Sequence, residues 1–183
     1  MRLNKFIAAL LVALLLVLAS ADVLLFRRYR QLQSMLNSSL FARVGERVPP
    51  LRGFDIERHQ VSIAYPAGSR PTLLLAFTAS CAFCEQNWPA WDKLRALSGR
   101  LGVRVVALSV GSYPSGKYVL EHSLAGVPFV AEVDPASVRA YHLLMAPATL
   151  LISPPGIVKW VWAGALQQRN LQQAESALQE IAR

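Results

Sequence analysis

The sequence predicts an α/β protein in which a mixed sheet is flanked by helices on both faces. The apolar run Thr72–Phe77 is typical of a buried strand, Glu85–Leu97 has a helical pattern, and Val103–Val110 is a second strong strand. Near the C-terminus, Ala148–Ile152 and Ile157–Trp162 flank a Ser-Pro-Pro-Gly turn, which is the pattern of a hairpin. Strand–helix–strand units followed by a hairpin give a sheet with parallel and antiparallel neighbours.

Shorter patterns complete a single domain at residues 48–183. Gly99 follows the first helix and is expected to end it, because glycine favours helix C-termini. The other expected elements are a weak strand at Val61–Tyr65, a short helix at Lys117–Leu124, a strand at Phe129–Val133, a helical turn at Pro135–His142 and a closing amphipathic helix at Leu171–Ile181.

The charge distribution argues against a nucleic-acid partner. The chain has 183 residues and a net charge of +8. Residues 1–47 carry seven Lys or Arg and two acidic residues, so five of the eight net charges precede the predicted domain. A nucleic-acid-binding protein concentrates its basic residues on the folded domain itself. A basic N-terminal part suits contact with anionic lipid headgroups instead.

An apolar segment occupies the N-terminus. Phe6–Phe26 is 21 residues long, and as a helix this length spans a bilayer. Residues 1–26 are therefore expected to be a membrane anchor, or a secretory signal cleaved after Ala19-Ser20-Ala21. The anchor is favoured because apolar residues resume after that site. Basic residues flank both ends of the segment, so charge alone leaves its orientation open.

Residues 27–47 are expected to connect this segment to the domain. Apolar side chains recur at helical spacing within Arg27–Val44, which predicts an amphipathic juxtamembrane helix. Gly45 is a plausible helix stop, and Pro49-Pro50 a plausible linker. The apolar positions of the helix are Tyr29, Leu32, Leu36 and Leu40.

The only two cysteines form one CxxC motif, Cys81-Ala82-Phe83-Cys84, at a strand-to-helix turn. A CxxC in this place is typical of a redox site. Disulfide exchange needs a thiolate, and the positive end of a helix dipole stabilises an anion at the helix N-terminus. Cys81 is placed at that end, and Cys84 follows one helical turn later. We therefore expect Cys81 to attack a partner sulfur and Cys84 to resolve the mixed disulfide.

Two other uses of the cysteines compete with redox chemistry. A zinc site needs more ligands, and none of His59, His122 and His142 has ligand spacing with the motif. A static disulfide across two residues gains little, because the closed loop is so short. A non-catalytic module that binds a metal or a partner chain is therefore the weaker alternative. No cofactor is expected beyond the Cys81–Cys84 pair.

Several segments resemble the thioredoxin-fold proteins. Leu73–Cys84 is similar to their active-site segment, Pro89 to the proline that kinks their active-site helix, and Met145–Leu150 to their cis-proline loop. Gly45–Leu51 resembles the entry segment of membrane-anchored relatives, the TlpA/ResA-type thiol–disulfide oxidoreductases, and Gly164 after the last strand also fits. The resemblance covers the chain from about Gly45 to its C-terminus.

The resemblance implies roles for further residues. Pro147 would be a cis-proline facing the cysteines, and Ala146 would present its backbone to an extended substrate. The Ala82-Phe83 dipeptide departs from the Gly-Pro or Glu-Pro type usual in this family, and its Phe83 would place an aromatic ring at the mouth of the site for an apolar partner. Many thioredoxins carry a buried acid where this chain has Leu75, so Glu85 is the candidate substitute as a proton relay.

The function implied is a protein-disulfide oxidoreductase, with the reductase direction favoured. Its substrates would be cysteine pairs of exported proteins, such as the haem-attachment cysteines of apocytochrome c or a maturing dehydrogenase, as in the MauD-type relatives. It would need a thiol electron donor, for which a membrane transporter is a candidate. Disulfide work on exported proteins places a single-pass protein in a bacterial inner membrane, with its domain facing the periplasm or cell exterior.

A thioredoxin-fold peroxidase is the alternative enzyme. Such enzymes use a Pro-x-x-x-Thr-x-x-Cys motif, and Thr78 stands three residues before Cys81 as that motif requires. Leu74 occupies the place of the proline, and a second cysteine three residues after the first is atypical. The peroxidase is therefore the less favoured assignment.

Overall fold

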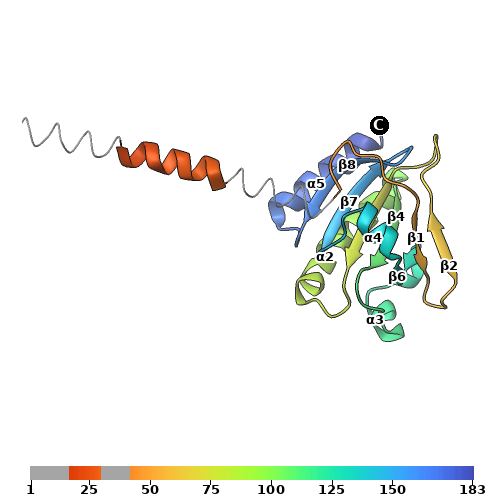
Figure 1. Cartoon of the computed structure of the whole chain (residues 1–183). Helices are drawn as coiled ribbons and strands as arrows, with labels where there is room; N and C mark the ends of the chain where they lie inside the picture. The colour runs from red at the N-terminus through yellow and green to blue at the C-terminus, as the bar shows by residue number, and fades with distance from the viewer. Residues whose placement is uncertain (1–16, 30–41) are drawn as a thin grey trace, which may run out of the picture. The chain divides into compact units, whose positions relative to one another are not determined.

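The computed structural model describes residues 17–29 and 42–183. The chain forms two units, Met1–Ser38 and Ser39–Arg183 (Figure 1). Residues 17–29 are helical, whereas residues 6–16 of the expected membrane segment and residues 30–41 of the expected amphipathic helix lie outside the described residues. Within the described ranges, no helix has both the length and the apolar character needed to cross a membrane.

A mixed five-stranded sheet forms the centre of the second unit (Figure 1). The central strand β3 runs parallel to β4 and antiparallel to β7, so the predicted mixed α/β sheet is confirmed. The spatial order is β5 (Phe129–Val130), β4 (Arg104–Ser109), β3 (Thr72–Phe77), β7 (Ala148–Ser153) and β8 (Ile157–Ala163).

Strand β3 is buried on both faces because its apolar side chains alternate between two cores. Leu73, Leu75 and Phe77 face a cluster covered by helices, whereas Leu74 and Ala76 face the opposite cluster. Each such fully buried large apolar side chain contributes about 1.5–3 kcal/mol to folding. The uninterrupted apolar run in the sequence therefore corresponds to the most deeply buried strand.

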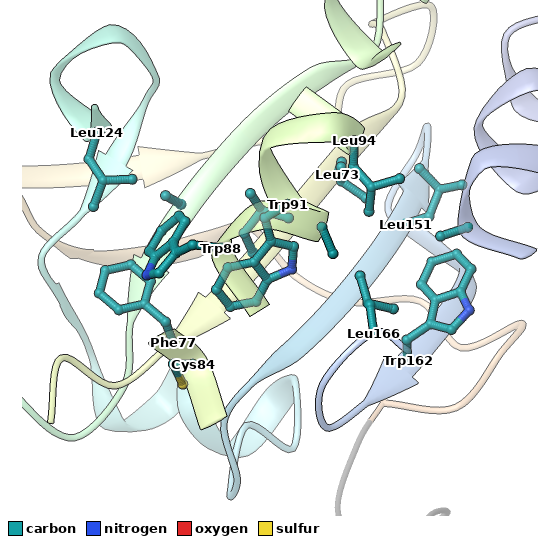
Figure 2. Close-up of a cluster of buried hydrophobic side chains, with 14 of the residues drawn as sticks. Leu73, Phe77, Cys84, Trp88, Trp91, Leu94, Leu124, Leu151, Trp162 and Leu166 are labelled. Carbon is teal, nitrogen blue, oxygen red and sulfur yellow. The ribbon is translucent and has the colours of Figure 1, made fainter. Parts of the chain in front are cut away.

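Three helices contribute to the first cluster, which also contains Cys84 (Figure 2). Trp88, Trp91 and Leu94 line its helical side, and Trp162 packs there from β8. Trp88 and Trp91 meet edge to face with ring centroids 4.9 Å apart, whereas Phe77 and Tyr118 are stacked at 5.4 Å. The three helices are α2 (Ala82–Leu101), α3 (Gly116–Glu121) and α5 (Gln168–Ile181).

The opposite cluster is covered by a small antiparallel sheet and a short helix. Its strands lie in the order β2 (Gln60–Ile63), β1 (Leu51–Phe54) and β6 (Glu132–Val133), and α4 spans Pro135–Ala140. Ala42, the first residue of the second described range, is buried in this cluster, and its N–H donates to the Tyr141 carbonyl at 3.1 Å.

Strand β1 was not expected from the sequence. Gly53 of β1 lies opposite Val133 of β6, and this close pairing requires a glycine at position 53. A Cβ added at Gly53 would lie 2.2 Å from the Glu132 carbonyl oxygen.

Helix α2 differs from its prediction at the C-terminal end. Gly99 does not end the helix, which continues to Leu101. Gly102 provides the stop instead, since it adopts φ 70°, where glycine has no Cβ penalty. The chain then turns directly into β4.

The single strand expected at Phe129–Val133 is also divided. Phe129–Val130 pairs with β4 in the large sheet, whereas Glu132–Val133 pairs with β1 in the small one. Between them, the Ala131 N–H donates to the Phe54 carbonyl at 2.7 Å. The 3-10 turn η1 (Leu124–Gly126) precedes this crossing point.

Candidate active site

Cys81 occupies the N-cap of α2. Its backbone is extended (φ −97°, ψ 112°), and its carbonyl accepts the first helical hydrogen bonds from the N–H groups of Cys84 at 2.9 Å and Glu85 at 3.2 Å. The side chain is partly exposed, and its Sγ lies 3.8 Å from the carbonyl oxygen of Ala146. Cys81 is therefore an accessible thiol at the positive end of a 20-residue helix.

Cys84 lies behind Cys81 and is fully buried. Both cysteines are free thiols. Burial, with a smaller contribution from the neighbouring Cys81, raises the pKa of the Cys84 thiol to about 12. The Thr78 N–H, 3.5 Å from the Cys84 sulfur, acts in the opposite direction because it favours the thiolate.

The loop before β7 faces Cys81, as the resemblance implied. The Ala146–Pro147 peptide bond is cis, which confirms that expectation. The Pro147 carbonyl accepts a hydrogen bond from the Gly164 N–H at 2.8 Å, which ties the loop to the chain after β8. Cys81, Cys84, Ala146 and Pro147 are thus brought together at one end of the central sheet.

Helix α2 is attached to this side of the sheet by two buried side-chain hydrogen bonds. Trp91 Nε1 donates to the Thr149 hydroxyl at 2.8 Å. The Asn87 side-chain oxygen accepts from the Leu166 N–H at 2.7 Å. Because Thr149 follows the cis-proline loop by two residues, the first bond sets the helix that carries the cysteines against that loop.

The segment that leads into the cysteines is braced by the loop after β4. The Thr78 hydroxyl donates to the Val110 carbonyl at 2.7 Å, and the Ala79 N–H donates to the Ser112 hydroxyl at 3.1 Å. Two hydrogen bonds from consecutive residues therefore hold the active-site turn.

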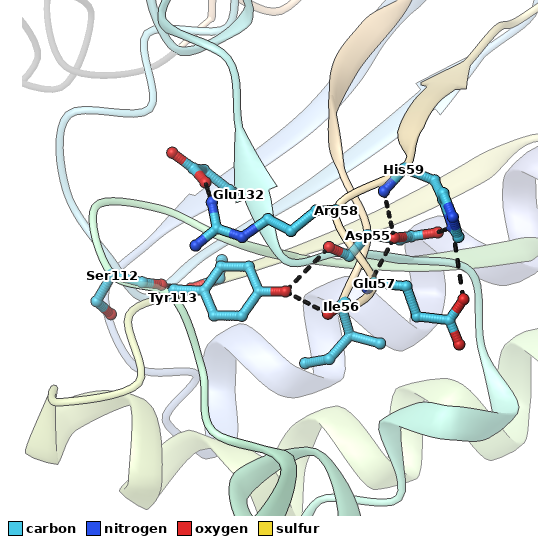
Figure 3. A network of polar contacts seen from close by, with 9 residues as sticks. Asp55, Ile56, Glu57, Arg58, His59, Ser112, Tyr113 and Glu132 are labelled. Atoms are coloured by element: carbon cyan, nitrogen blue, oxygen red, sulfur yellow. Dashed lines mark hydrogen bonds and ion pairs between the residues drawn. The ribbon is translucent and has the colours of Figure 1, made fainter.

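The same loop is held from its other side by the β1–β2 hairpin, as Figure 3 shows. The Tyr113 hydroxyl donates to the carbonyls of Asp55 and Ile56. Arg58 lies over the Tyr113 ring at 4.2 Å and pairs with Glu132 at 2.7 Å. The active-site turn is thereby connected to the small sheet.

Glu85, the candidate relay, is half-exposed on the first turn of α2. Its Oε2 lies 3.2 Å from Nε2 of His122, and the His122 ring stacks on Trp88 with centroids 4.3 Å apart. The negative charge of Glu85 contributes to the raised pKa of Cys84, after burial and the effect of Cys81. No sequence pattern links His122 to Glu85, since the two residues are 37 positions apart.

Apolar side chains are exposed beside the cysteines. Phe83 is 65% exposed on the first turn of α2, and Leu144 and Met145 are 61% and 54% exposed just before Ala146. Exposed apolar side chains gathered at a reactive centre suit contact with another protein. The position of Phe83 is consistent with a docking role, which stays a prediction.

No metal centre is evident in the part of the chain that the structure describes. Within residues 17–29 and 42–183, no group of three His, Cys, Asp or Glu side chains is arranged to hold a metal ion. Of the three histidines considered as ligands, His122 pairs with Glu85, and His59 lies in the hairpin near Asp55 and Glu57.

Comparison with known proteins identifies a family. The AhpC/TSA family model matches residues 44–161, well over half of the chain. No curated protein matches the sequence.

Solved structures resemble the fold at low sequence identity. The thioredoxin domain of a thiol-disulfide oxidoreductase from Bacteroides vulgatus superposes with a TM-score of 0.57 at 16% identity, covering 77% of this chain and 99% of that one. A DsbF homologue from Corynebacterium diphtheriae gives 0.56 at 21% identity, covering 75% and 90%. A peroxiredoxin-like protein from Aquifex aeolicus gives 0.58 at 14%, covering 77% and 88%. At such identities the similarity establishes the thioredoxin-like fold.

Proposed function

The chain belongs to the AhpC/TSA family, and we propose that it is a thiol–disulfide oxidoreductase that exchanges disulfides with other proteins through Cys81 and Cys84. The observation that carries the proposal is the unequal placement of the two thiols. Cys81 is accessible at a helix N-terminus and faces the cis-proline loop, whereas Cys84 is buried behind it. This arrangement supports attack by Cys81 and resolution by Cys84.

In the reductase direction, the Cys81 thiolate attacks one sulfur of a substrate disulfide. The substrate S–S bond breaks, a mixed disulfide forms, and the second substrate sulfur leaves as a thiolate. Cys84 then attacks the Cys81 sulfur, which releases the first substrate sulfur and leaves a Cys81–Cys84 disulfide. Two electrons have passed to the substrate, and an external thiol donor restores the dithiol.

The surroundings of Cys84 favour this order of events. In the free dithiol, burial and the adjacent Cys81 both keep Cys84 protonated. Once Cys81 is bonded to a substrate sulfur, its contribution to the raised pKa of Cys84 disappears, while the Thr78 N–H continues to favour the thiolate. Cys84 therefore becomes a better nucleophile only when a mixed disulfide is present to be resolved.

Peroxidase chemistry is less well supported by the same site. The single proton of the Thr78 hydroxyl is donated to the Val110 carbonyl, so it is not available to polarise a peroxide at Cys81. A hydrogen peroxide consumption assay with a thiol donor distinguishes the two activities. Turnover of peroxide that matches turnover of protein disulfides would favour the peroxidase.

We also propose a cellular compartment and a class of substrates for this protein. The apolar run Phe6–Phe26 supports a single-pass protein of a bacterial inner membrane, with the domain in the periplasm or cell exterior. The substrates we propose are cysteine pairs of exported proteins, including apocytochrome c or a maturing dehydrogenase. The Ala146 backbone and the exposed Phe83 would contact the substrate. A thiol transporter in the membrane would supply electrons.

Trapping in cells tests the proposal and identifies the partners. The Cys84→Ala variant is expected to accumulate disulfide-linked adducts through Cys81 that disappear on reduction. The matched control is the Cys81→Ala/Cys84→Ala variant, which should form none. Absence of adducts with the single variant would contradict the assignment of Cys81 as the attacking thiol.

A further inference from the structure

The peptide group between Phe77 and Thr78 points its N–H at the buried cysteine. This N–H lies 3.5 Å from the Cys84 sulfur and donates a hydrogen bond to it. The carbonyl of the same peptide group accepts from the Val110 N–H at 2.8 Å. In a trans peptide the N–H and the C=O point in opposite directions. The bond from Val110 therefore also sets the direction of the N–H that faces Cys84.

The Thr78 side chain completes a reciprocal pair with the same residue. Its hydroxyl donates to the Val110 carbonyl at 2.7 Å, while the Val110 N–H donates to the Phe77 carbonyl. A hydroxyl has one proton, and here that proton is used by Val110. The pair lies directly beyond the last residues that β3 and β4 hold in register, Phe77 and Ser109. Rotation of the Thr78 backbone would break at least one of the two bonds.

A further bond holds the next peptide group. The Ala79 N–H donates to the Ser112 hydroxyl at 3.1 Å. The Ser112 carbonyl in turn accepts from the hydroxyl of Ser109, which is buried at the end of β4. The peptide groups on both sides of Thr78 are thus tied to β4 and to the loop that follows it.

The direction of the Thr78 N–H matters because Cys84 must become an anion to act. A hydrogen-bond donor favours the thiolate over the thiol. Hydrogen bonds weaken steeply as the donor turns away from the acceptor, so this help depends on how firmly residue 78 is held. A more stable thiolate is also a weaker nucleophile, but its nucleophilicity falls by only about half as much as its population rises, on a logarithmic scale. The net effect of the N–H is faster attack by Cys84.

We propose that Thr78 and Ser112 are positioning residues for the resolving step, whose hydroxyls hold the Thr78 N–H against the Cys84 sulfur. The inference rests on the proposed dithiol function. In the mixed disulfide, the Cys84 thiol loses its proton to water, and the thiolate attacks the Cys81 sulfur. The bond between Cys81 and the partner sulfur breaks, and the partner leaves as a thiolate. A Cys81–Cys84 disulfide remains.

A two-phase reaction with 5,5′-dithiobis(2-nitrobenzoic acid) measures the resolving step separately from the attack. One equivalent is added to the reduced full-length protein in detergent. Attack by Cys81 releases the first thionitrobenzoate, and resolution by Cys84 releases the second. Thr78→Val keeps the shape of the side chain without its hydroxyl, and it should slow the second release by about three- to tenfold while the first is unchanged. Ser112→Ala should also slow only the second release.

Conservative and matched variants separate positioning from general damage. Thr78→Ser and Ser112→Thr keep a hydroxyl at each position and should restore the second release to near the wild-type rate. Ser115→Ala is the matched control, because the Ser115 hydroxyl accepts from the Tyr118 N–H at 3.2 Å and caps α3 without a bond to the active-site turn. Its loss should lower stability but leave both releases unchanged.

Three results would overturn the positioning role. They are an unchanged second release in Thr78→Val and Ser112→Ala, equal slowing of both releases, and slowing by Thr78→Ser that matches that of Thr78→Val. If Thr78→Val does not fold, Ser112→Ala and Ser112→Thr decide the question, since the Ser112 side chain is only partly buried. A wild-type protein that never makes the second release would instead contradict the dithiol function itself.

Discussion

Alkylation of the native, reduced protein is expected to separate the two thiols by reactivity. Burial raises the pKa of Cys84 from 9.0 to about 12. Iodoacetamide reacts with the thiolate, and each pKa unit changes the thiolate fraction tenfold, so at pH 7 Cys84 should react about a thousandfold more slowly than in the unfolded chain. Cys81 is partly exposed and should be labelled in the native state.

The measurement is a time course of labelling followed by digestion and mass spectrometry. Fragment ions that separate Ala82 from Phe83 assign each label to Cys81 or Cys84. The same protein unfolded in guanidinium chloride provides the reference rate for Cys84. Between pH 7 and pH 9 the native Cys84 rate should rise about tenfold per unit, because the thiol remains far below its pKa.

One result would refute the reasoning. If native Cys84 were labelled within about tenfold of its unfolded rate, neither its burial nor its raised pKa would hold in solution. The assignment of Cys81 as the attacking thiol would then lose its physical basis, since both thiols would be available to a substrate.

Three substitutions test the packing around the site. Gly53→Ala should lower the free energy of unfolding by about 1–3 kcal/mol, measured by urea titration, because the new Cβ would lie 2.2 Å from the Glu132 carbonyl oxygen; unchanged stability would contradict the close approach. Gly99→Ala should raise it by about 0.5–1 kcal/mol, since Gly99 lies within α2 and no atom lies within 4 Å of the new Cβ; a loss of stability would contradict this. Trp91→Phe should cost about 1–3 kcal/mol because it leaves the buried Thr149 hydroxyl without its donor, and Thr149→Val in the same chain should recover part of the loss.

The features that could be predicted from the sequence are those that leave a pattern in neighbouring residues. Strand β3 is an unbroken apolar run, and a strand buried on both faces needs such a run. The cysteines identified the start of α2 because both lie within one helical turn of it. The cis bond before Pro147 came from the resemblance, since no local pattern in the residues distinguishes the two isomers.

The features that the sequence did not predict depend on contacts between distant segments. Strand β1 is only four residues long and follows Pro49-Pro50, so its sequence resembles a linker. Its pairing with β6 depends on the close approach of Gly53 to the Glu132 carbonyl across the small sheet, which only the folded structure shows. Likewise, Glu85 and His122 belong to different helices, and no periodicity relates their positions.

The burial of β3 explains why an acidic side chain at the position of Leu75 would be costly in this protein. Leu75, where many thioredoxins carry an acid, is fully buried and lies in register with Ala107 and Thr149 on the neighbouring strands. An isolated carboxylate there would need a partner in an apolar core. Glu85 avoids this cost because it is half-exposed and pairs with His122 at 3.2 Å.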